Sequence, residues 1–297
     1  MLSPTEEIDP GPTSYLADDV DRLADLFLRA ERLLVLTGAG CSTESGIPDY
    51  RSPGGLWTNH KPIYYADFVR SAAARQRYWA RSMAGWRSFH QAAPNPAHQA
   101  LAVLEARGRI QALITQNVDR LHQAAGSQAV LELHGHNDGV VCLQCGREIP
   151  RPAMQAAMQA LNPTWHAQPV AVAPDGDAQL DASLIAGFRV PNCAACGGLL
   201  KPNVVFFGES VPAARVAQAT ALVEESDALL VVGSSLTVWS GYRFARQAAV
   251  AGKPLAILNL GPTRADALAT FKIEQRVGTF LPLVLEHVGP RAVARTG

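Results

Sequence analysis

Two pairs of cysteines have the spacing expected of metal ligands. Cys142 and Cys145 form one C-x-x-C pair, and Cys193 and Cys196 form another after a long intervening segment. A glycine follows each pair and lets the backbone turn its N–H groups toward the thiolates. Four thiolates suit tetrahedral Zn²⁺ with no open position, so we expect one structural zinc ion. Redox-active C-x-x-C motifs or unrelated free thiols are the alternatives.

The segment from Thr37 onward begins like a dinucleotide-binding loop. Gly38 and Gly40 permit the tight turn and the close backbone approach that a pyrophosphate requires. Ser42 and Thr43 can then cap a short helix whose N-terminus faces the anion. Thr43 also stands where the third glycine of G-x-G-x-x-G would be, and a lone G-x-G is equally typical of a tight turn.

The chain beyond this loop departs from a dehydrogenase. Gly46 and Pro48 stop the helix after about one turn. Asp49, Tyr50 and Arg51 follow, which places charged and aromatic groups near the nicotinamide end of a cofactor. A dehydrogenase does not need such a loop, whereas an enzyme that breaks its cofactor can use one.

Two side chains near these loops have types suited to covalent or proton-transfer chemistry. Cys41 at a helix N-terminus can act as a nucleophile, but no histidine neighbours it in sequence, and a small packing residue is the favoured interpretation. His134 has a side chain suited to general-base catalysis near neutral pH, although a single histidine is more often structural.

Other polar groups offer contacts to a nucleotide. The amides and the carboxylate at 116–119 can hydrogen-bond to ribose hydroxyls and to a carboxamide. The serine hydroxyls at 234–235, at the start of a predicted helix, can bind a phosphate. Asn259 can bind a ribose. Ordinary turns and helix caps are the alternatives for each. The candidates are Gln116, Asn117, Val118, Asp119, Gly233, Ser234, Ser235, Asn259, Leu260 and Gly261.

These residues follow short apolar runs that alternate with helix-like segments. The runs are Leu33–Leu36, Ala112–Thr115, Val130–Leu133, Ala228–Val232 and Leu255–Leu258. Runs of this kind predict an α/β fold with a doubly wound, Rossmann-like parallel sheet covered on both faces. Ligands bind such sheets at the carboxyl edge of the strands, which is where the polar groups fall.

Two segments interrupt this alternation and predict a smaller lobe. The first carries an amphipathic pattern around Arg75–Arg81, and the second contains the paired cysteines. The predicted boundaries are an N-terminal tail at 1–17, a Rossmann-like domain at 18–47, 97–135 and 201–290, a cofactor loop and helical module at 48–96, and a zinc-binding module at 136–200.

The charge composition of the chain limits which macromolecules it can bind. Lys plus Arg and Asp plus Glu both number 26, and no basic run is present, which excludes nucleic acid and anionic membranes as primary partners. The acidic, Pro-containing N-terminus resembles neither a signal nor a transit peptide. An Arg-rich, Ala-rich chain indicates a bacterial, cytoplasmic enzyme. The oligomeric state is left open.

Taken together, the motifs resemble the sirtuins, the NAD-dependent protein-lysine deacylases. The matching stretches, in order, are G-A-G-x-S-x-x-S-G-I-P-D-Y-R-S, T-Q-N-V-D-x-L-H, E-L-H-G, the two C-x-x-C pairs, K-P-N-V-V-F-F-G-E, V-G-S-S-L and N-L-G-P-T. The resemblance implies that acyl-lysine proteins are the substrates, that NAD is a co-substrate and that a zinc ion is structural.

The resemblance also assigns roles to residues. Gln116 and Asn117 would hold the nicotinamide ribose, and Val118 and Asp119 the carboxamide. The glycine and serine of 233–235 and residues 259–261 would bind phosphate and adenosine. Val277 would flank adenine. The substrate peptide would pair as an extra strand with Val204, Val205, Phe206, Phe207 and Gly208. The loop around NAD would comprise Gly38, Ala39, Gly40, Cys41, Ser42, Thr43, Ile47, Pro48, Asp49, Tyr50, Arg51 and Trp57.

The implied mechanism cleaves NAD. The acyl-lysine oxygen displaces nicotinamide at C1′ of the ribose, and His134, with Asn117 beside it, then activates a ribose hydroxyl that takes over the acyl group. Several stretches resemble the class II sirtuins, which act on acetyl, lipoyl or dicarboxylic acyl groups or transfer ADP-ribose. Tyr78 and Arg81 match a Tyr-x-x-Arg pattern that reads acidic acyl groups, unless the helix leaves Arg81 in solvent.

Three rival functions remain. A protein ADP-ribosyltransferase or NAD glycohydrolase would use the same pocket with another acceptor, and a lipoamidase or dicarboxylic-acyl hydrolase would use it with another acyl group. A non-catalytic zinc-ribbon module on a nucleotide-sensing scaffold would not need His134 or Asn117. A hydride-transferring dehydrogenase is disfavoured by the truncated helix after Ser42.

Overall fold

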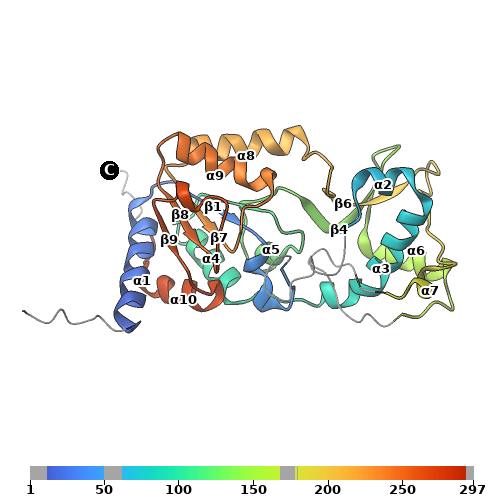
Figure 1. Ribbon diagram of the computed structural model, residues 1–297, viewed down its shortest axis with the longest axis horizontal. Helices are drawn as coiled ribbons and strands as arrows, with labels where there is room; N and C mark the ends of the chain where they lie inside the picture. The colour runs from blue at the N-terminus through green and yellow to red at the C-terminus, as the bar shows by residue number, and fades with distance from the viewer. Residues whose placement is uncertain (1–11, 50–61, 168–177, 179, 292–297) are drawn as a thin grey trace, which may run out of the picture.

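The computed structural model describes residues 12–49, 62–167, 178 and 180–291. Three residues of the predicted NAD loop, Tyr50, Arg51 and Trp57, lie outside the described residues. Figure 1 shows a sheet flanked by helices, and beside it a smaller lobe that carries α2, α3, α6 and α7. Within the described part of the chain, no helix is both long and apolar enough to cross a membrane.

The larger part is built on a six-stranded sheet in the order β3-β2-β1-β7-β8-β9, with every neighbouring pair parallel. Its strands are β1 (Leu33–Thr37), β2 (Ala112–Thr115), β3 (Val130–Glu132), β7 (Ala228–Val232), β8 (Leu255–Leu258) and β9 (Phe271–Ile273). The five predicted runs correspond to the first five strands. The edge strand β9 was not predicted, because its three residues Phe-Lys-Ile form no continuous apolar run.

Alternating residues of the strands bury into two separate helical layers. In β1, Leu33 and Val35 pack in one hydrophobic cluster with α1 (Pro12–Arg29), α4 (Pro96–Ala106) and α10 (Val277–His287). Leu34 and Leu36 point to the other face and pack with α8 (Ala213–Glu225) and α9 (Trp239–Val250). Figure 1 shows these two layers on opposite sides of the sheet, which confirms the doubly wound fold.

The smaller lobe contains an antiparallel sheet in the order β5-β4-β6. Its elements are β4 (Gly135–Cys142), β5 (Glu148–Pro150), β6 (Leu200–Val204), α2 (Tyr65–Arg70), α3 (Ala72–His90), α6 (Arg151–Leu161) and α7 (Ala182–Ile185). One hydrophobic cluster joins Trp79 of α3 to Val140 of β4 and Met154 of α6. The two interrupting segments therefore share a hydrophobic core. On this basis we propose the domain boundaries predicted above.

Candidate functional site

A cleft of about 1530 Å³ lies along the carboxyl ends of β1, β2, β7 and β8 and extends to the loop after β6. Most of the sequence-predicted site residues line it. They are Gly38, Ala39, Gly40, Ser42, Thr43, Ile47, Pro48, Asp49, Tyr78, Gln116, Asn117, Val118, Asp119, His134, Val204, Val205, Phe206, Phe207, Gly208, Gly233, Ser234, Ser235, Asn259, Leu260, Gly261 and Val277.

Two glycine loops meet at the floor of the cleft. The N–H of Gly40 donates to the carbonyl of Gly233 at 2.8 Å. A Cβ at Gly40 would lie 2.9 Å from that carbonyl oxygen, and one at Gly38 would lie 2.7 Å from Cβ of Ser234. Gly233 adopts the left-handed conformation with φ of 59°. These glycines therefore allow the loops after β1 and β7 to touch.

Two local predictions about these loops were wrong. The chain after Gly38 forms two short 3₁₀ turns, Ala39–Cys41 and Thr43–Ser45, without a side-chain cap, so Ser42 and Thr43 do not cap a helix. Gly233 to Ser235 do not begin a helix either, because α9 starts at Trp239. Ser42 and Ser234 instead make tertiary hydrogen bonds, while the hydroxyls of Thr43 and Ser235 bond locally to the Gly40 carbonyl and the Thr237 hydroxyl.

Ser42 instead joins a polar network with the residues after β2. Asn117 Nδ2 donates to Ser42 Oγ and to the Gly38 carbonyl, each at 3.0 Å. Ser42 Oγ donates to Asp119 Oδ2 at 2.7 Å. Burial raises the pKa of Asp119, while its bonds from the Leu121 N–H and the Ser42 hydroxyl oppose the rise. The network fixes an amide and a carboxyl at the wall of the cleft.

Gln116 makes contact with both glycine loops. Its Nε2 donates to Ser234 Oγ at 2.7 Å and to the Thr37 carbonyl at 3.2 Å. Its backbone carbonyl faces His134, whose Nδ1 lies 2.9 Å away. Since a carbonyl can only accept, Nδ1 of His134 carries the hydrogen.

His134 lies between β3 and β4, where the two lobes join, and lines the cleft. Burial lowers its pKa to about 4, the hydrogen bond to Gln116 opposes this shift, and the Arg215 charge adds to it. The imidazole is therefore neutral at pH 7. With the hydrogen on Nδ1, Nε2 has a free electron pair that can accept a proton.

The loop that follows β6 forms the opposite wall. The N–H of Val205 donates to the His134 carbonyl at 2.8 Å, and the N–H of Tyr65 donates to the Phe207 carbonyl at 2.9 Å. Lys201 of β6 is buried and pairs with Glu209 at 3.0 Å, and Glu209 also accepts from the Phe206 N–H at 2.8 Å. The loop is held from both ends.

Tyr78 and Arg81 lie one turn apart on α3. Tyr78 is buried against Phe68 and Phe206 and reaches the cleft. Arg81 is not among the described cleft-lining residues, and its Nε donates to the Ala178 carbonyl at 2.9 Å. The pairing of Tyr78 and Arg81 around an acidic acyl group therefore stays a prediction.

Cys41 lies in the hydrophobic core beneath the glycine loop and does not line the cleft. Burial raises the pKa of its thiol, and the nearby carboxyls of Asp119 and Glu44 add to the rise. His98 and His122, remote in sequence, offer nitrogens within 4.8 Å of its sulfur. A buried neutral thiol of this kind suits packing rather than nucleophilic attack.

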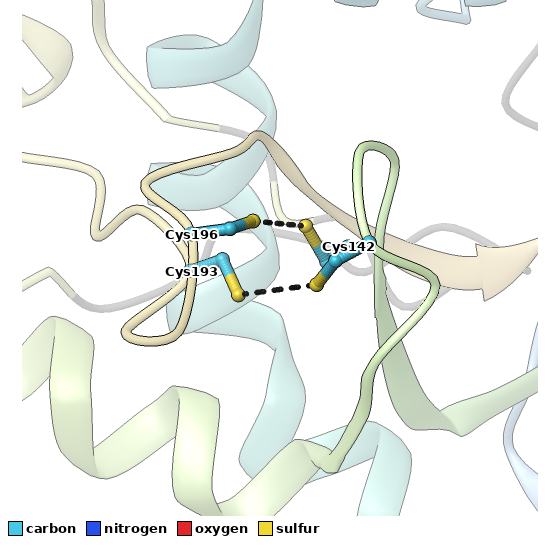
Figure 2. A group of neighbouring side chains, drawn as sticks. Cys142, Cys193 and Cys196 are labelled. Carbon is cyan, nitrogen blue, oxygen red and sulfur yellow. Dashed lines mark hydrogen bonds between the residues drawn. The ribbon is translucent and has the colours of Figure 1, made fainter.

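The four paired cysteines meet at one end of the small lobe. Figure 2 shows Cys142 on one loop facing Cys193 and Cys196 on another. The Cys142 and Cys196 sulfurs lie 3.5 Å apart, and those of Cys145 and Cys193 lie 3.8 Å apart. Zn–S bonds of about 2.3 Å in a tetrahedron place sulfurs about 3.8 Å apart. The donor set and its separations fit a structural zinc ion.

Backbone N–H groups are already turned toward these sulfurs. Those of Cys145 and Gln144 lower the pKa of the Cys142 thiol to about 6. The Gly198 N–H likewise lowers the pKa of Cys196, but the neighbouring Cys142 and Cys145 sulfurs raise it above its usual value, and a bound cation would offset this repulsion between thiolates.

The sequence left several lining residues unassigned. They include Ser240, whose Oγ lies 2.8 Å from His134 Nε2, and Glu44, Trp239, Arg243 and Arg276. The signal for Ser240 is weak, since a serine two residues into a helix normally suggests a capping role. Its approach to His134 depends on how the first turn of α9 packs beside Gln116.

Comparisons with known proteins agree with this geometry. The model of the Sir2 family matches residues 38–240. An NAD-dependent protein deacetylase of Xanthomonas axonopodis pv. citri (strain 306) is 56% identical over 263 residues, which cover 89% of this chain and 90% of that protein. The NAD-dependent protein lipoamidase sirtuin-4, mitochondrial, of Homo sapiens is 52% identical over 270 residues, covering 90% and 86%.

A solved structure shares the fold. The complex described as Sir2 with p53 peptide and NAD+ has a TM-score of 0.73 and 33% identity, and the match covers 90% of this chain and 97% of that chain.

Proposed function

The chain belongs to the Sir2 family, and on that premise we propose that it is an NAD-dependent protein-lysine deacetylase. It would cleave NAD to nicotinamide and move the acyl group from lysine to ADP-ribose. The observation that carries the proposal is the setting of His134: a neutral imidazole with an available Nε2, placed between the polar residues after β2 and the loop after β6.

The cleft supports a specific placement of NAD. Gly38, Gly40 and Ser234 line the cleft where the loops after β1 and β7 meet, and a pyrophosphate would lie beside them. Asn117 and Asp119, fixed by Ser42, would hold the nicotinamide half, while Asn259 to Gly261 and Val277 would contact adenosine. We propose that Asp49, Tyr50, Arg51 and Trp57 also bind the co-substrate. The acyl-lysine peptide would lie along 204–208 as an added strand.

The proposed reaction proceeds in three steps. The acyl-lysine carbonyl oxygen attacks C1′ of the nicotinamide ribose, nicotinamide leaves, and an amidate forms. His134 Nε2 takes the proton of a ribose hydroxyl, whose oxygen attacks the amidate carbon. Water finally releases free lysine and O-acyl-ADP-ribose. The buried walls around Tyr78 and Phe206 exclude competing water from the acyl group.

Cys142, Cys145, Cys193 and Cys196 would hold the zinc ion, whose closed tetrahedral site supplies structural stability to the small lobe. The ion is not needed for the transfer itself. We also propose a cytoplasmic location, supported by the bacterial relatives and by four reduced thiols at metal-binding separations.

To test the deacylase function, the pure protein is incubated with NAD and with acetyl-, succinyl-, lipoyl- or long-chain acyl-lysine peptides. The products are identified by mass spectrometry. We expect nicotinamide, free lysine peptide and O-acyl-ADP-ribose, with the acetyl peptide as a substrate. The succinyl and lipoyl peptides test the acyl groups suggested by Arg81 and by the human relative.

His134→Ala should lower deacylation at least about a hundredfold, which is typical of removing a general base, while NAD affinity stays close to that of the unaltered protein. His287→Ala, an exposed histidine at the end of α10, is the matched control and should be fully active. ADP-ribosylated protein in place of O-acyl-ADP-ribose would favour the transferase, and the absence of nicotinamide release would contradict catalysis altogether.

A further inference from the structure

The first turn of α9 reaches the catalytic histidine. Ser240 Oγ lies 2.8 Å from His134 Nε2, while the Gln116 carbonyl lies 2.9 Å from Nδ1 at the other end of the ring. Because the hydrogen of the neutral ring is on Nδ1, Nε2 can only accept, and the Ser240 hydroxyl is the donor. Both nitrogens therefore have a partner in the protein.

Hydrogen bonds at both nitrogens fix the orientation of the imidazole ring more firmly than one hydrogen bond would. The torsion that rotates an imidazole about its Cβ–Cγ bond is broad and roughly two-fold, so a flipped ring is accessible when one anchor is lost. A flip would exchange Nε2 with a carbon and remove the base from its position. Gln116 follows β2 and Ser240 lies in the first turn of α9, so the two anchors come from separate elements of the Rossmann-like domain.

We propose, on the premise of the deacylase function above, that Ser240 is a positioning residue for His134: its hydroxyl fixes the plane of the imidazole and keeps Nε2 directed into the cleft. Nε2 has one electron pair, so the ribose hydroxyl must displace the Ser240 hydroxyl when NAD and the acyl-lysine have reacted. Ser240 thus holds the base in place until its proton donor arrives.

The bond to Ser240 also changes during proton transfer. The O–H bond of the ribose breaks, its electron pair stays on the oxygen that attacks the amidate, and a new N–H bond forms at Nε2. Ser240 Oγ can then rotate and accept from this N–H. A hydrogen bond from the charged imidazolium is stronger than one to the neutral ring. The contact therefore stabilises the imidazolium once the ribose oxygen has moved to the amidate carbon.

Ser240→Ala tests the proposal, because alanine is well tolerated in the first turn of a helix and the protein should fold. We expect the kcat for O-acyl-ADP-ribose formation to fall about five- to tenfold, the range of one hydrogen bond. The KM for NAD should change less than about twofold. Exchange of labelled nicotinamide into NAD, which precedes the proton transfer, should persist at the original rate.

Two further variants and one spectroscopic measurement sharpen the test. Ser240→Thr keeps the hydroxyl and should restore kcat, and Ser88→Ala, an exposed serine on α3, should leave it unaltered. Nitrogen-15 NMR of the histidine rings, with the His134 signals assigned from His134→Ala, should show a single Nδ1–H tautomer. In Ser240→Ala these signals should broaden as the ring samples two orientations.

Unchanged kcat together with unchanged ring signals would overturn the role of Ser240. A parallel loss of nicotinamide exchange and deacylation would also overturn it, because that result indicates general damage to the cleft. If the unaltered protein produces no O-acyl-ADP-ribose, the proposed function fails instead, and the NMR comparison still decides whether Ser240 holds the ring.

Discussion

At Gly241 the absence of a side chain makes room for a neighbour. A Cβ there would lie 2.4 Å from Oε1 of Gln116, far inside van der Waals contact. Gln116 uses this space to reach Ser234 Oγ and the Thr37 carbonyl. The position of a residue proposed to hold the nicotinamide ribose therefore depends on a glycine in α9, next to the serine that contacts His134.

Gly241→Ala should displace the Gln116 carboxamide and break its two hydrogen bonds. We expect the KM for NAD to rise about thirtyfold, at roughly 1 kcal/mol for each of the two net hydrogen bonds, while helix propensity keeps the protein folded. Steady-state kinetics at varied NAD, with circular dichroism as the check on folding, measures this effect. Gly289→Ala, where nothing lies within 4 Å of an added Cβ, is the control; equal KM values for both variants would contradict the argument.

At the scale of elements, β6 and the loop after it depend on one buried ion pair. Burial lowers the pKa of Lys201, and the Glu209 carboxylate beside it opposes that shift. Glu209 also accepts the Phe206 N–H, so it fixes the loop proposed to pair with the substrate peptide. Breaking a buried pair by altering one partner is costly, because the other charge remains in the interior.

Glu209→Gln should therefore weaken peptide binding more than NAD binding. We expect a several-fold rise in the KM for the acyl-peptide and a loss of up to about 3 kcal/mol in the free energy of unfolding. Urea denaturation and peptide-dependent kinetics supply the two measurements. Glu286→Gln on the exposed face of α10 is the matched control. An unchanged peptide KM in Glu209→Gln would show that the pair does not organise the loop.

The zinc-binding turns are a second element on which the small lobe depends. β4 and β6 pair directly, and Cys142 and Leu200 at the end of that pairing carry the strands into the two cysteine turns. Zinc binding to such sites contributes several kcal/mol or more to folding. The metal therefore stabilises the lobe that completes the peptide-binding wall.

Metal analysis should find one zinc ion per chain, and a strong chelator or Cys196→Ser should lower the melting temperature by several degrees or more. Readdition of zinc should restore the chelated protein, which separates metal loss from irreversible damage. Cys41→Ser, outside the tetrathiolate set, should retain its zinc. A protein free of zinc with an unaltered melting curve would contradict the structural role.

At the scale of the whole molecule, buried histidines couple stability to pH. Burial lowers the pKa of His98 to about 4 and that of His122 well below its usual range of 6.5, and both side chains are almost fully enclosed. The unfolded chain binds these protons near pH 6.5, whereas folded His98 takes up its proton only near pH 4 and folded His122 only well below its usual pKa. Stability is therefore complete above pH 6.5 and declines as the pH falls toward 4.

The expected loss from His98 alone is roughly 3 kcal/mol across that window. Urea unfolding measured between pH 7.5 and 4.5 should show it. His98→Gln keeps an acceptor for the Asn95 N–H of the capping box and should flatten the pH dependence. His287→Ala removes an exposed histidine and should leave the pH dependence of stability unchanged. Equal slopes in all three proteins would show that His98 is not the source.

Much of the Rossmann-like domain could be predicted from the sequence because its signals are local. Leu33 to Leu36 and Ala228 to Val232 are apolar on both faces, which is sufficient to indicate interior parallel strands. Gln116, Asn117 and His134 follow such strands, and the carboxyl edge of a parallel sheet brings them together. The C-x-x-C spacing similarly indicates four thiolates around one ion.

By itself, then, the sequence determined the parallel sheet, the tetrathiolate ligands and the residues gathered at one edge of the sheet, since these follow from periodicity and short-range spacing. Only the tertiary structure decided that Ser42 bonds to Asp119 instead of capping a helix, that Arg81 donates to the Ala178 carbonyl, and that Ser240 reaches His134. Each of these depends on contacts between segments far apart in the chain. A side chain's partner there is set by how whole elements pack, which local pattern does not encode.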